Sequence, residues 1–352
     1  MSKFVKAIIC VIVLFCSFFI LALSYYMYQL GPTSKEEQTV QIEIPRGSTG
    51  NDVALILKEN NLIKDVNVFK LYIKIHNVNN IGHGIYNLNK TMGVKKITET
   101  ITSGKALNKD ISITFKEGLN MRGIAKVIKE NTNNSYNDVL TLLEDEEYID
   151  TLIEEYWFLT DEIKNKDIYY PLEGYLSPNT YRFVDKNVTV DKIFRTMLDQ
   201  TGKVLDKYKN DIKGHTVHEF LTLASIVQSE GLNKDDMPYM ASVFYNRLDK
   251  KMSFGSCSTA CYAAKFDGLC VPKNVNTKYN SPYNTYLSSM IGLPIGPISN
   301  PGEVAIQAAI NPADTDYLYF LSDINKKTYF TRSNSEHIAK KQELIKAGLW
   351  HE

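Results

Sequence analysis

A run of 24 residues without a single charge, residues 7–30, stands near the N-terminus of the chain. About 20 apolar residues are enough to cross the hydrocarbon core of a bilayer as an α-helix. Lys3 and Lys6 come just before the run, and the cytoplasmic flanks of membrane helices carry an excess of positive charge. The sequence therefore predicts a membrane anchor over residues 7–30, a cytoplasmic N-terminus over residues 1–6, and an extracytoplasmic location for everything after Leu30.

A cleaved signal peptide is the alternative interpretation of the same run. Ala22 and Ser24 are small residues at the spacing of a cleavage site. Against this, Tyr25, Tyr26 and Tyr28 suit the outer membrane interface, and the length of the run favours an anchor that is kept.

The chain as a whole has the composition of a globular protein. Hydrophobic residues make up 44% and charged residues 23% of the 352 residues, which suffices for a core in two or three domains. Lys+Arg and Asp+Glu balance at 40 each. This balance gives no indication of a nucleic-acid partner.

An internal repeat follows a short polar linker over residues 31–39. Residues 40–60 align without a gap onto residues 111–131, which places Gly47 opposite Gly118. Each copy begins with alternating apolar residues, passes a turn with glycine, and continues with apolar residues at helical spacing. We expect two small strand–helix units, which must pack together or on a neighbour to bury their apolar faces.

A change of composition predicts the boundary of a second domain near residue 167. Residues 134–166 are acidic with a helical pattern, whereas aromatic residues, prolines and asparagines become dense from Tyr169 onwards. We expect a repeat region with a helical extension over residues 40–166. A mixed α+β domain with a cleft is expected over residues 167–352, because helices alternate there with loops rich in Pro, Asn and Gly.

One predicted helix, residues 217–230, ends on a carboxylate. Thr216 and Glu219 form a capping box at its start, its wide apolar stripe predicts burial, and Gly231 suits a left-handed C′ position. Glu230 continues an apolar row of the helix, at the negative end of the helix dipole. Both features favour the neutral carboxylic acid, the form that a general acid requires. The alternative is a glutamate that frays into water.

Four loops follow this helix: residues 255–263, with small hydroxyl residues, and residues 281–286, 292–302 and 308–320, which carry Asn, Thr or Tyr. Such residues bind sugars, because hydroxyls meet amide and phenol groups and sugar faces stack on rings. Each is also an ordinary turn residue. Four such loops in about 70 residues after the candidate acid nevertheless indicate a sugar-binding site.

The cysteines and histidines do not form a strong metal-binding pattern. Cys257, Cys261 and Cys270 are an odd number, so at most one disulfide forms among them and one thiol is left over. A Cys₃ metal site is the alternative, but no histidine stands at ligand spacing beside them. The six histidines contain no HExxH-like pair. We therefore expect no metal and no cofactor.

Taken in order, these motifs resemble the endolytic murein transglycosylases, a family of membrane-anchored enzymes with a LysM-like region and a C-terminal catalytic domain. The resemblance covers nearly the whole chain and rests on the segments LEGYLSPNTY, LASIVQSE, VFYNRL, YNTY, GLPIGPISNPG and NPADTDYLYF. It implies an α+β fold: a transmembrane helix, a small LysM-like strand–helix repeat region and a catalytic domain with a cleft.

The resemblance also implies a reaction. The family cleaves peptidoglycan strands between N-acetylmuramic acid and N-acetylglucosamine without water, which leaves 1,6-anhydro ends. Glu230 falls on the catalytic acid, and no second carboxylate is needed, unlike in two-carboxylate hydrolases. A role in terminating nascent strands and cell-wall synthases as partners are further implications.

The candidate substrate-binding residues are Ser256, Thr259, Tyr283, Asn284, Tyr286 and Asn311. The candidate supporting residues are Gln228, Asn246 and Glu173, the last of which also suits a structural salt bridge.

The chain departs from the family pattern at four places. Gln228 stands where the family usually has a first glutamate, and residues 256–259 read Ser-Cys-Ser-Thr instead of Ser-Asp-Pro-Thr. Ile295 replaces a second proline and Asn179 a common aspartate. The alternatives to a transglycosylase are therefore a wall-binding scaffold protein that no longer cuts and a glycan hydrolase.

Overall fold

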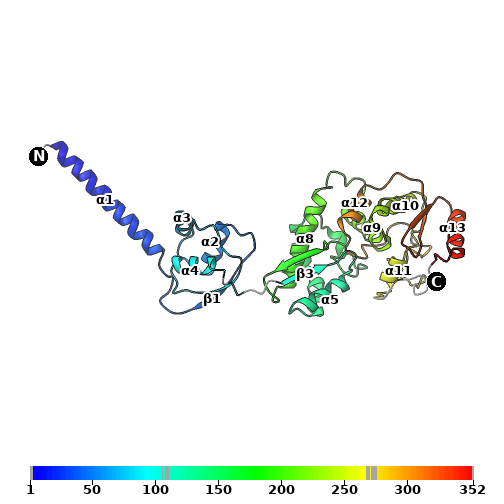
Figure 1. Cartoon of the computed structure of the whole chain (residues 1–352), viewed down its shortest axis with the longest axis horizontal. Helices are drawn as coiled ribbons and strands as arrows, with labels where there is room; N and C mark the ends of the chain where they lie inside the picture. The colour runs from blue at the N-terminus through cyan, green and yellow to red at the C-terminus, as the bar shows by residue number, and fades with distance from the viewer. Residues whose placement is uncertain (1–2, 105, 108–110, 267–269, 271–275, 351–352) are drawn as a thin grey trace. The chain divides into compact units, whose positions relative to one another are not determined.

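A computed structural model describes residues 3–104, 106–107, 111–266, 270 and 276–350 of the chain, which divide into two compact units, Met1–Asp110 and Ile111–Glu352 (Figure 1). Each unit mixes helices with two-stranded antiparallel sheets, so the predicted α+β class is confirmed. The first unit contains α1 (Lys3–Gln29), β1 (Thr39–Ile44), α2 (Gly50–Glu59), α3 (Val66–Ile75), β2 (Gly84–Asn89) and α4 (Val94–Thr102).

The second unit carries the remaining elements. They are β3 (Ile111–Phe115), α5 (Met121–Asn131), α6 (Tyr136–Glu144), α7 (Glu146–Glu155), η1 (Asp161–Lys164), β4 (Asn179–Phe183), α8 (Val190–Asp206), α9 (Val217–Glu230), η2 (Lys234–Asp236), α10 (Met237–Asp249), α11 (Cys257–Ala263), α12 (Glu303–Ile310), β5 (Tyr319–Ser322), β6 (Thr328–Thr331) and α13 (Asn334–Lys346).

The uncharged N-terminal run folds as α1. Its segment Ile12–Gln29 is long and apolar enough to cross a membrane, and none of that segment is buried within the described structure. Such a helix is compatible with a membrane anchor and with a signal sequence. The first two residues of the predicted cytoplasmic N-terminus lie outside the described residues.

The segment predicted as a linker, residues 31–39, is attached to the folded part of the first unit. The backbone N–H groups of Thr33 and Ser34 donate to the carbonyl of Lys90, each at 3.2 Å, and the Thr33 hydroxyl donates to the carbonyl of Asn61 at 2.7 Å. The predicted linker therefore makes hydrogen bonds to the folded part of the first unit.

The two repeat copies have the predicted strand–turn–helix structure. The first copy forms β1 and α2, and the second forms β3 and α5. Gly47 and Gly118, which the alignment places together, have φ angles of +83° and +79°. This left-handed conformation favours glycine because it has no Cβ. Thr49 and Asn120 are the N-caps of the two helices, so the local geometry repeats down to the cap.

The two copies nevertheless belong to different units, which corrects the predicted boundary near residue 167. The second copy pairs its strand β3 with β4, with Ile111 opposite Phe183 and Phe115 opposite Asn179. The first copy pairs β1 with β2. Apolar side chains of β3 and α5 share one core with α8 and α9. The chain therefore divides between Asp110 and Ile111, because long-range strand pairing and core packing join residues 111–166 to the C-terminal half of the chain.

Helix α9 lies at the centre of the second unit. Its capping box is formed by Thr216 and Glu219 as predicted, and it packs against α10 and α12. Its side chains from Phe220 to Val227 are all buried, which confirms the predicted burial. Gly231 has φ −76°, so the predicted left-handed cap is wrong. A Cβ there would lie 2.8 Å from the carbonyl oxygen of Val227, so close backbone approach is what restricts this position.

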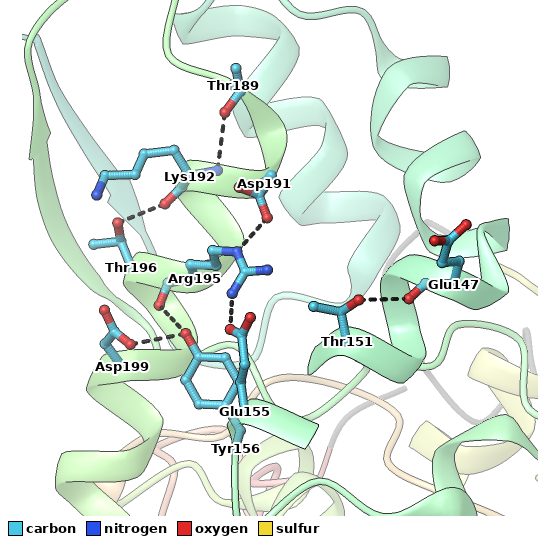
Figure 2. A network of polar contacts seen from close by, with 10 residues as sticks. All are labelled: Glu147, Thr151, Glu155, Tyr156, Thr189, Asp191, Lys192, Arg195, Thr196 and Asp199. Atoms are coloured by element: carbon cyan, nitrogen blue, oxygen red, sulfur yellow. Dashed lines mark hydrogen bonds and ion pairs between the residues drawn. The ribbon is translucent and has the colours of Figure 1, made fainter. Parts of the chain in front are cut away.

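A polar network joins the acidic helix α7 to α8 (Figure 2). The Arg195 guanidinium contacts the carboxylates of Asp191, at 2.6 Å, and Glu155. The Tyr156 hydroxyl donates to Asp199 at 2.9 Å. Only 27% of the Arg195 side chain is exposed, so these charge-assisted bonds are partly shielded from water. Arg195 thereby fixes the end of α7 on α8.

We predict that Arg195→Gln lowers the free energy of unfolding of the second unit by about 1–2 kcal/mol, because two carboxylates lose their shared cation. Urea titration of residues 31–352 followed by tryptophan fluorescence measures this, since both tryptophans, Trp157 and Trp350, lie in the second unit. The control is Lys192→Gln, which removes a positive charge at an exposed position of the same helix. Equal stability of the two variants would contradict the role of Arg195.

Candidate active site

The carboxylate of Glu230 is held through one of its two oxygens. Oε1 accepts hydrogen bonds from the Ser256 hydroxyl at 2.6 Å and from the Ser258 hydroxyl at 2.9 Å. The backbone N–H of Ser258 adds a longer bond of 3.4 Å. Among the described residues, Oε2 has no hydrogen-bond partner. The half-buried Glu230 therefore has one positioned oxygen and one oxygen available to another molecule.

The turn that carries both serines is fixed from behind by two buried threonines. The Thr285 hydroxyl accepts from the backbone N–H of Ser256 at 3.1 Å and lies 2.8 Å from the hydroxyl of Thr259. The Thr259 hydroxyl donates to the carbonyl of Ser256 at 2.8 Å. Thr259 and Thr285 are both 0% exposed. The sequence analysis named Thr259 as a substrate contact, but its hydroxyl is occupied within the fold.

Tyr283 and Asn284, two further predicted substrate contacts, are also fully buried. The Tyr283 ring lies 4.8 Å from the ring of Tyr262 in α11. The Asn284 side chain donates to the carbonyl of Tyr279 at 2.7 Å and accepts from the N–H of Tyr286 at 3.1 Å. Both residues therefore shape the loop that supports α11, and a substrate cannot reach them in this structure.

Tyr286 and Asn311 are the predicted contacts with exposed surface. Tyr286 is half-buried, and its hydroxyl lies 3.1 Å from the Cys257 sulfur. Burial raises the pKa values of both the Tyr286 hydroxyl and the Cys257 thiol. Asn311 is exposed at the C-cap of α12, and none of the hydrogen bonds between described residues links it to Glu230.

The cysteines follow the expectation of one bridge and one remaining thiol. Cys261 and Cys270 form a disulfide, and Cys257 is free. No group of three or more His, Cys, Asp or Glu side chains suited to a metal ion occurs within the described residues.

Gln228 and Asn246, two predicted supporting residues, make hydrogen bonds to the backbone. The Gln228 side-chain oxygen accepts from the N–H of Gly302, the N-cap of α12, at 2.9 Å. The Asn246 amide donates to the carbonyls of Thr315 and Tyr317 at 2.8 and 2.9 Å. A glutamate at position 228 could accept the same bond from Gly302. The departure from Glu-x-Glu therefore leaves this link to α12 in place.

Glu173, the third supporting residue, is a buried carboxyl behind α11. It accepts hydrogen bonds from the N–H of Met121 at 2.9 Å, from the hydroxyl of Tyr262 at 3.0 Å and from the amide of Asn300 at 3.0 Å. Its side chain is 1% exposed, and this burial raises its pKa from 4.5 to about 7, although the bond from Met121 opposes the rise.

Two residues that the sequence analysis did not select have central places in this arrangement. Ser258 lies in the first turn of α11, in a segment expected to be a loop of small hydroxyl residues, and its position two residues after Ser256 is the signal that could have identified it. Asn300 accepts from the N–H of Leu176 at 2.8 Å and donates to the carbonyl of Leu119 at 3.0 Å. It thereby links the turn of the second repeat copy to the Glu173 segment, a contact that sequence spacing does not reveal.

We predict that the buried Glu173 makes stability fall as the pH rises from about 4.5 to 7. In that range the folded chain retains a proton on Glu173 that the unfolded chain releases. The free energy of unfolding is therefore highest below pH 4.5 and falls until the pH passes the pKa of Glu173 in the folded chain. Relative to Glu173→Gln, the free energy of unfolding should decrease by about 3 kcal/mol over this range. Urea titrations at pH 4.5, 6 and 8 measure the difference, and a constant difference would contradict the raised pKa.

The sequence pattern of the YceG-like family matches residues 42–343, and the chain belongs to this family. A curated relative from Bacillus subtilis (strain 168), named endolytic murein transglycosylase, is 39% identical over 321 residues, which cover 90% of this chain and 88% of the relative. Relatives of the same name from Streptococcus pneumoniae strains D39 and R6 are 30% identical over 86% of this chain, which spans 58% of their length.

A solved structure agrees with the fold. The crystal structure of a YceG-like protein from Listeria monocytogenes at 2.6 Å is 34% identical to this chain, with a TM-score of 0.62. The match covers 87% of this chain and 100% of that chain. The α+β architecture is therefore shared with a member of the family.

Proposed function

We propose that the chain is an endolytic peptidoglycan transglycosylase and that Glu230 is its catalytic acid and base. The relatives' names support the activity, since the Bacillus subtilis relative spans most of both chains. The observation that carries the assignment of the residue is the arrangement of its carboxyl group. Ser256 and Ser258 hold Oε1, which leaves Oε2 for a proton and for the glycosidic oxygen.

The proposed reaction needs one carboxyl group in two roles. Glu230 first donates its proton to the glycosidic oxygen, and the bond between this oxygen and the muramyl anomeric carbon breaks. The muramyl 6-hydroxyl then attacks that carbon and forms the 1,6-anhydro ring, while its proton passes to the Glu230 carboxylate. The proton count is balanced without water, so neither a second carboxylate nor a cofactor is required.

The exposed surface of each predicted contact residue decides whether a substrate can reach it. We propose that Tyr286 and Asn311 face the glycan strand, because they retain exposed surface. Thr259, Tyr283 and Asn284 instead position the loop that carries Ser256. The glycan strand is proposed to lie in a cleft beside the free oxygen of Glu230.

The N-terminal helix α1, which lies outside the catalytic unit, supports a location of the protein at the membrane. We propose that α1 is retained as a single-pass anchor with its N-terminus in the cytoplasm, because Lys3 and Lys6 come before the apolar segment. The first strand–turn–helix copy, formed by β1 and α2, is proposed to belong to a LysM-like region of the first unit. At this location the enzyme is proposed to terminate nascent glycan strands beside cell-wall synthases.

Glu230→Gln should reduce the cleavage of purified glycan strands by about 10³-fold or more, because the same group acts in both proton transfers. Gln228→Glu is the matched control and should keep most of the activity, since glutamate can also accept the bond from Gly302. Liquid chromatography of digests by residues 31–352 measures both. Unchanged cleavage by Glu230→Gln would overturn the assignment of the acid.

Ser256→Ala and Ser258→Ala should each lower kcat by about tenfold, with little change in KM, because a charge-assisted bond to Oε1 is lost. Ser229→Ala is the control: Ser229 lies next to Glu230 but donates to the carbonyl of Ser225 at 2.8 Å. It should keep normal kcat. If Ser229→Ala were as damaging as the other two variants, the positioning role of Ser256 and Ser258 would be refuted.

A further inference from the structure

A polar cavity of about 600 Å³ lies in the first unit, at the end of α1. Three lysines, Lys58, Lys64 and Lys90, line it together with Tyr28 and Gln29 of the helix. None of the described residues that line this cavity is acidic. The cavity is open to solvent, and its described lining is positively charged.

Lys64 is fixed at the end of α1 by two interactions. Its ammonium donates to the carbonyl of Tyr28 at 2.9 Å and lies 3.7 Å from the centre of the Tyr28 ring. Helix C-termini and aromatic faces both favour a cation. Lys58 donates to the carbonyl of Lys64 at 2.8 Å. Each ammonium has three N–H donors, so both retain donors for a ligand.

Lys90 also lines the cavity and follows directly after β2. Lys90 is half-buried, and its backbone carbonyl accepts hydrogen bonds from the backbone N–H groups of Thr33 and Ser34. The ion pairs between described residues include none with Lys58, Lys64 or Lys90. The described lining of the cavity thus carries three lysines and no carboxylate, and an anion would stabilise this positive charge.

We propose that this cavity binds the phosphate of an anionic phospholipid headgroup. The inference rests on the proposed anchor, because the apolar segment Ile12–Gln29 ends at residues that line the cavity. The lysines then lie at the depth of the headgroups of the extracytoplasmic leaflet, where an anionic headgroup can pair with them. The bound headgroup would hold the first unit close against the membrane.

The test uses the full chain in nanodiscs of phosphatidylcholine and phosphatidylglycerol at three to one, followed by native mass spectrometry of the released protein. The unmodified chain should retain phosphatidylglycerol, and the Lys58→Gln, Lys64→Gln, Lys90→Gln variant should retain at least about tenfold less. The control is Lys74→Gln, Lys95→Gln, Lys96→Gln, which removes the same charge at exposed positions of the same unit. Lys90→Glu alone should also lose the lipid, and it leaves the contacts of Lys64 with α1 intact.

Equal retention by all variants would overturn the proposal, because the lipid would then surround α1 without a site. Retention of inorganic phosphate by the chain, without any phosphatidylglycerol, would overturn the headgroup as the source. Failure of the chain to enter nanodiscs at all would refute the anchor instead. Glycan cleavage in detergent should be the same for all these variants, so the outcome is independent of the proposed reaction.

Discussion

The burial of α9 is the constraint on which the second unit depends. The helix is buried without a break from Phe220 to Val227 and ends three residues later on a half-buried carboxyl group. Neighbouring loops must therefore satisfy the polar groups around it. The Ser225 hydroxyl accepts from the N–H of Ile298 at 3.0 Å, and the His218 ring bonds to the carbonyl of Ile295 at 2.9 Å. These bonds dock residues 295–298 along the helix. The position of Glu230 follows from the rigidity of the element that presents it.

The helix α11 connects the two carboxyl groups of the site. Its start supplies the serines that bind Glu230, and Tyr262 near its end donates to Glu173. A buried carboxyl with three hydrogen-bond donors is costly to displace. Glu173 therefore fixes the back of α11, and Thr259 and Thr285 fix its first turn. Most of the polar residues in these loops serve this support, and only a few remain to contact a glycan strand.

The sequence predicted the features that depend on local patterns. The spacing of apolar residues identified α9, and Thr216 and Glu219 identified its N-terminal capping box. The glycine turns identified both strand–helix copies. All of these features depend on neighbours in the chain. The boundary near residue 167 was wrong because β3 pairs with a strand about 70 residues later, a contact that composition does not report. Likewise, Thr259, Tyr283 and Asn284 have the residue types of a sugar site, but their burial depends on packing. The contact of Ser258 with Glu230 also depends on packing, in this case of α11 against α9.

The central proposal is that the Glu230 carboxyl group acts on an internal nucleophile, the muramyl 6-hydroxyl, and that water takes no part in the cleavage. Digestion of purified glycan strands in ¹⁸O-labelled water, followed by mass spectrometry of the new ends, tests this directly. The account predicts muramyl ends that are lighter by one water and carry no label, absent from a Glu230→Gln digest. Labelled reducing ends would contradict it and make the protein a hydrolase.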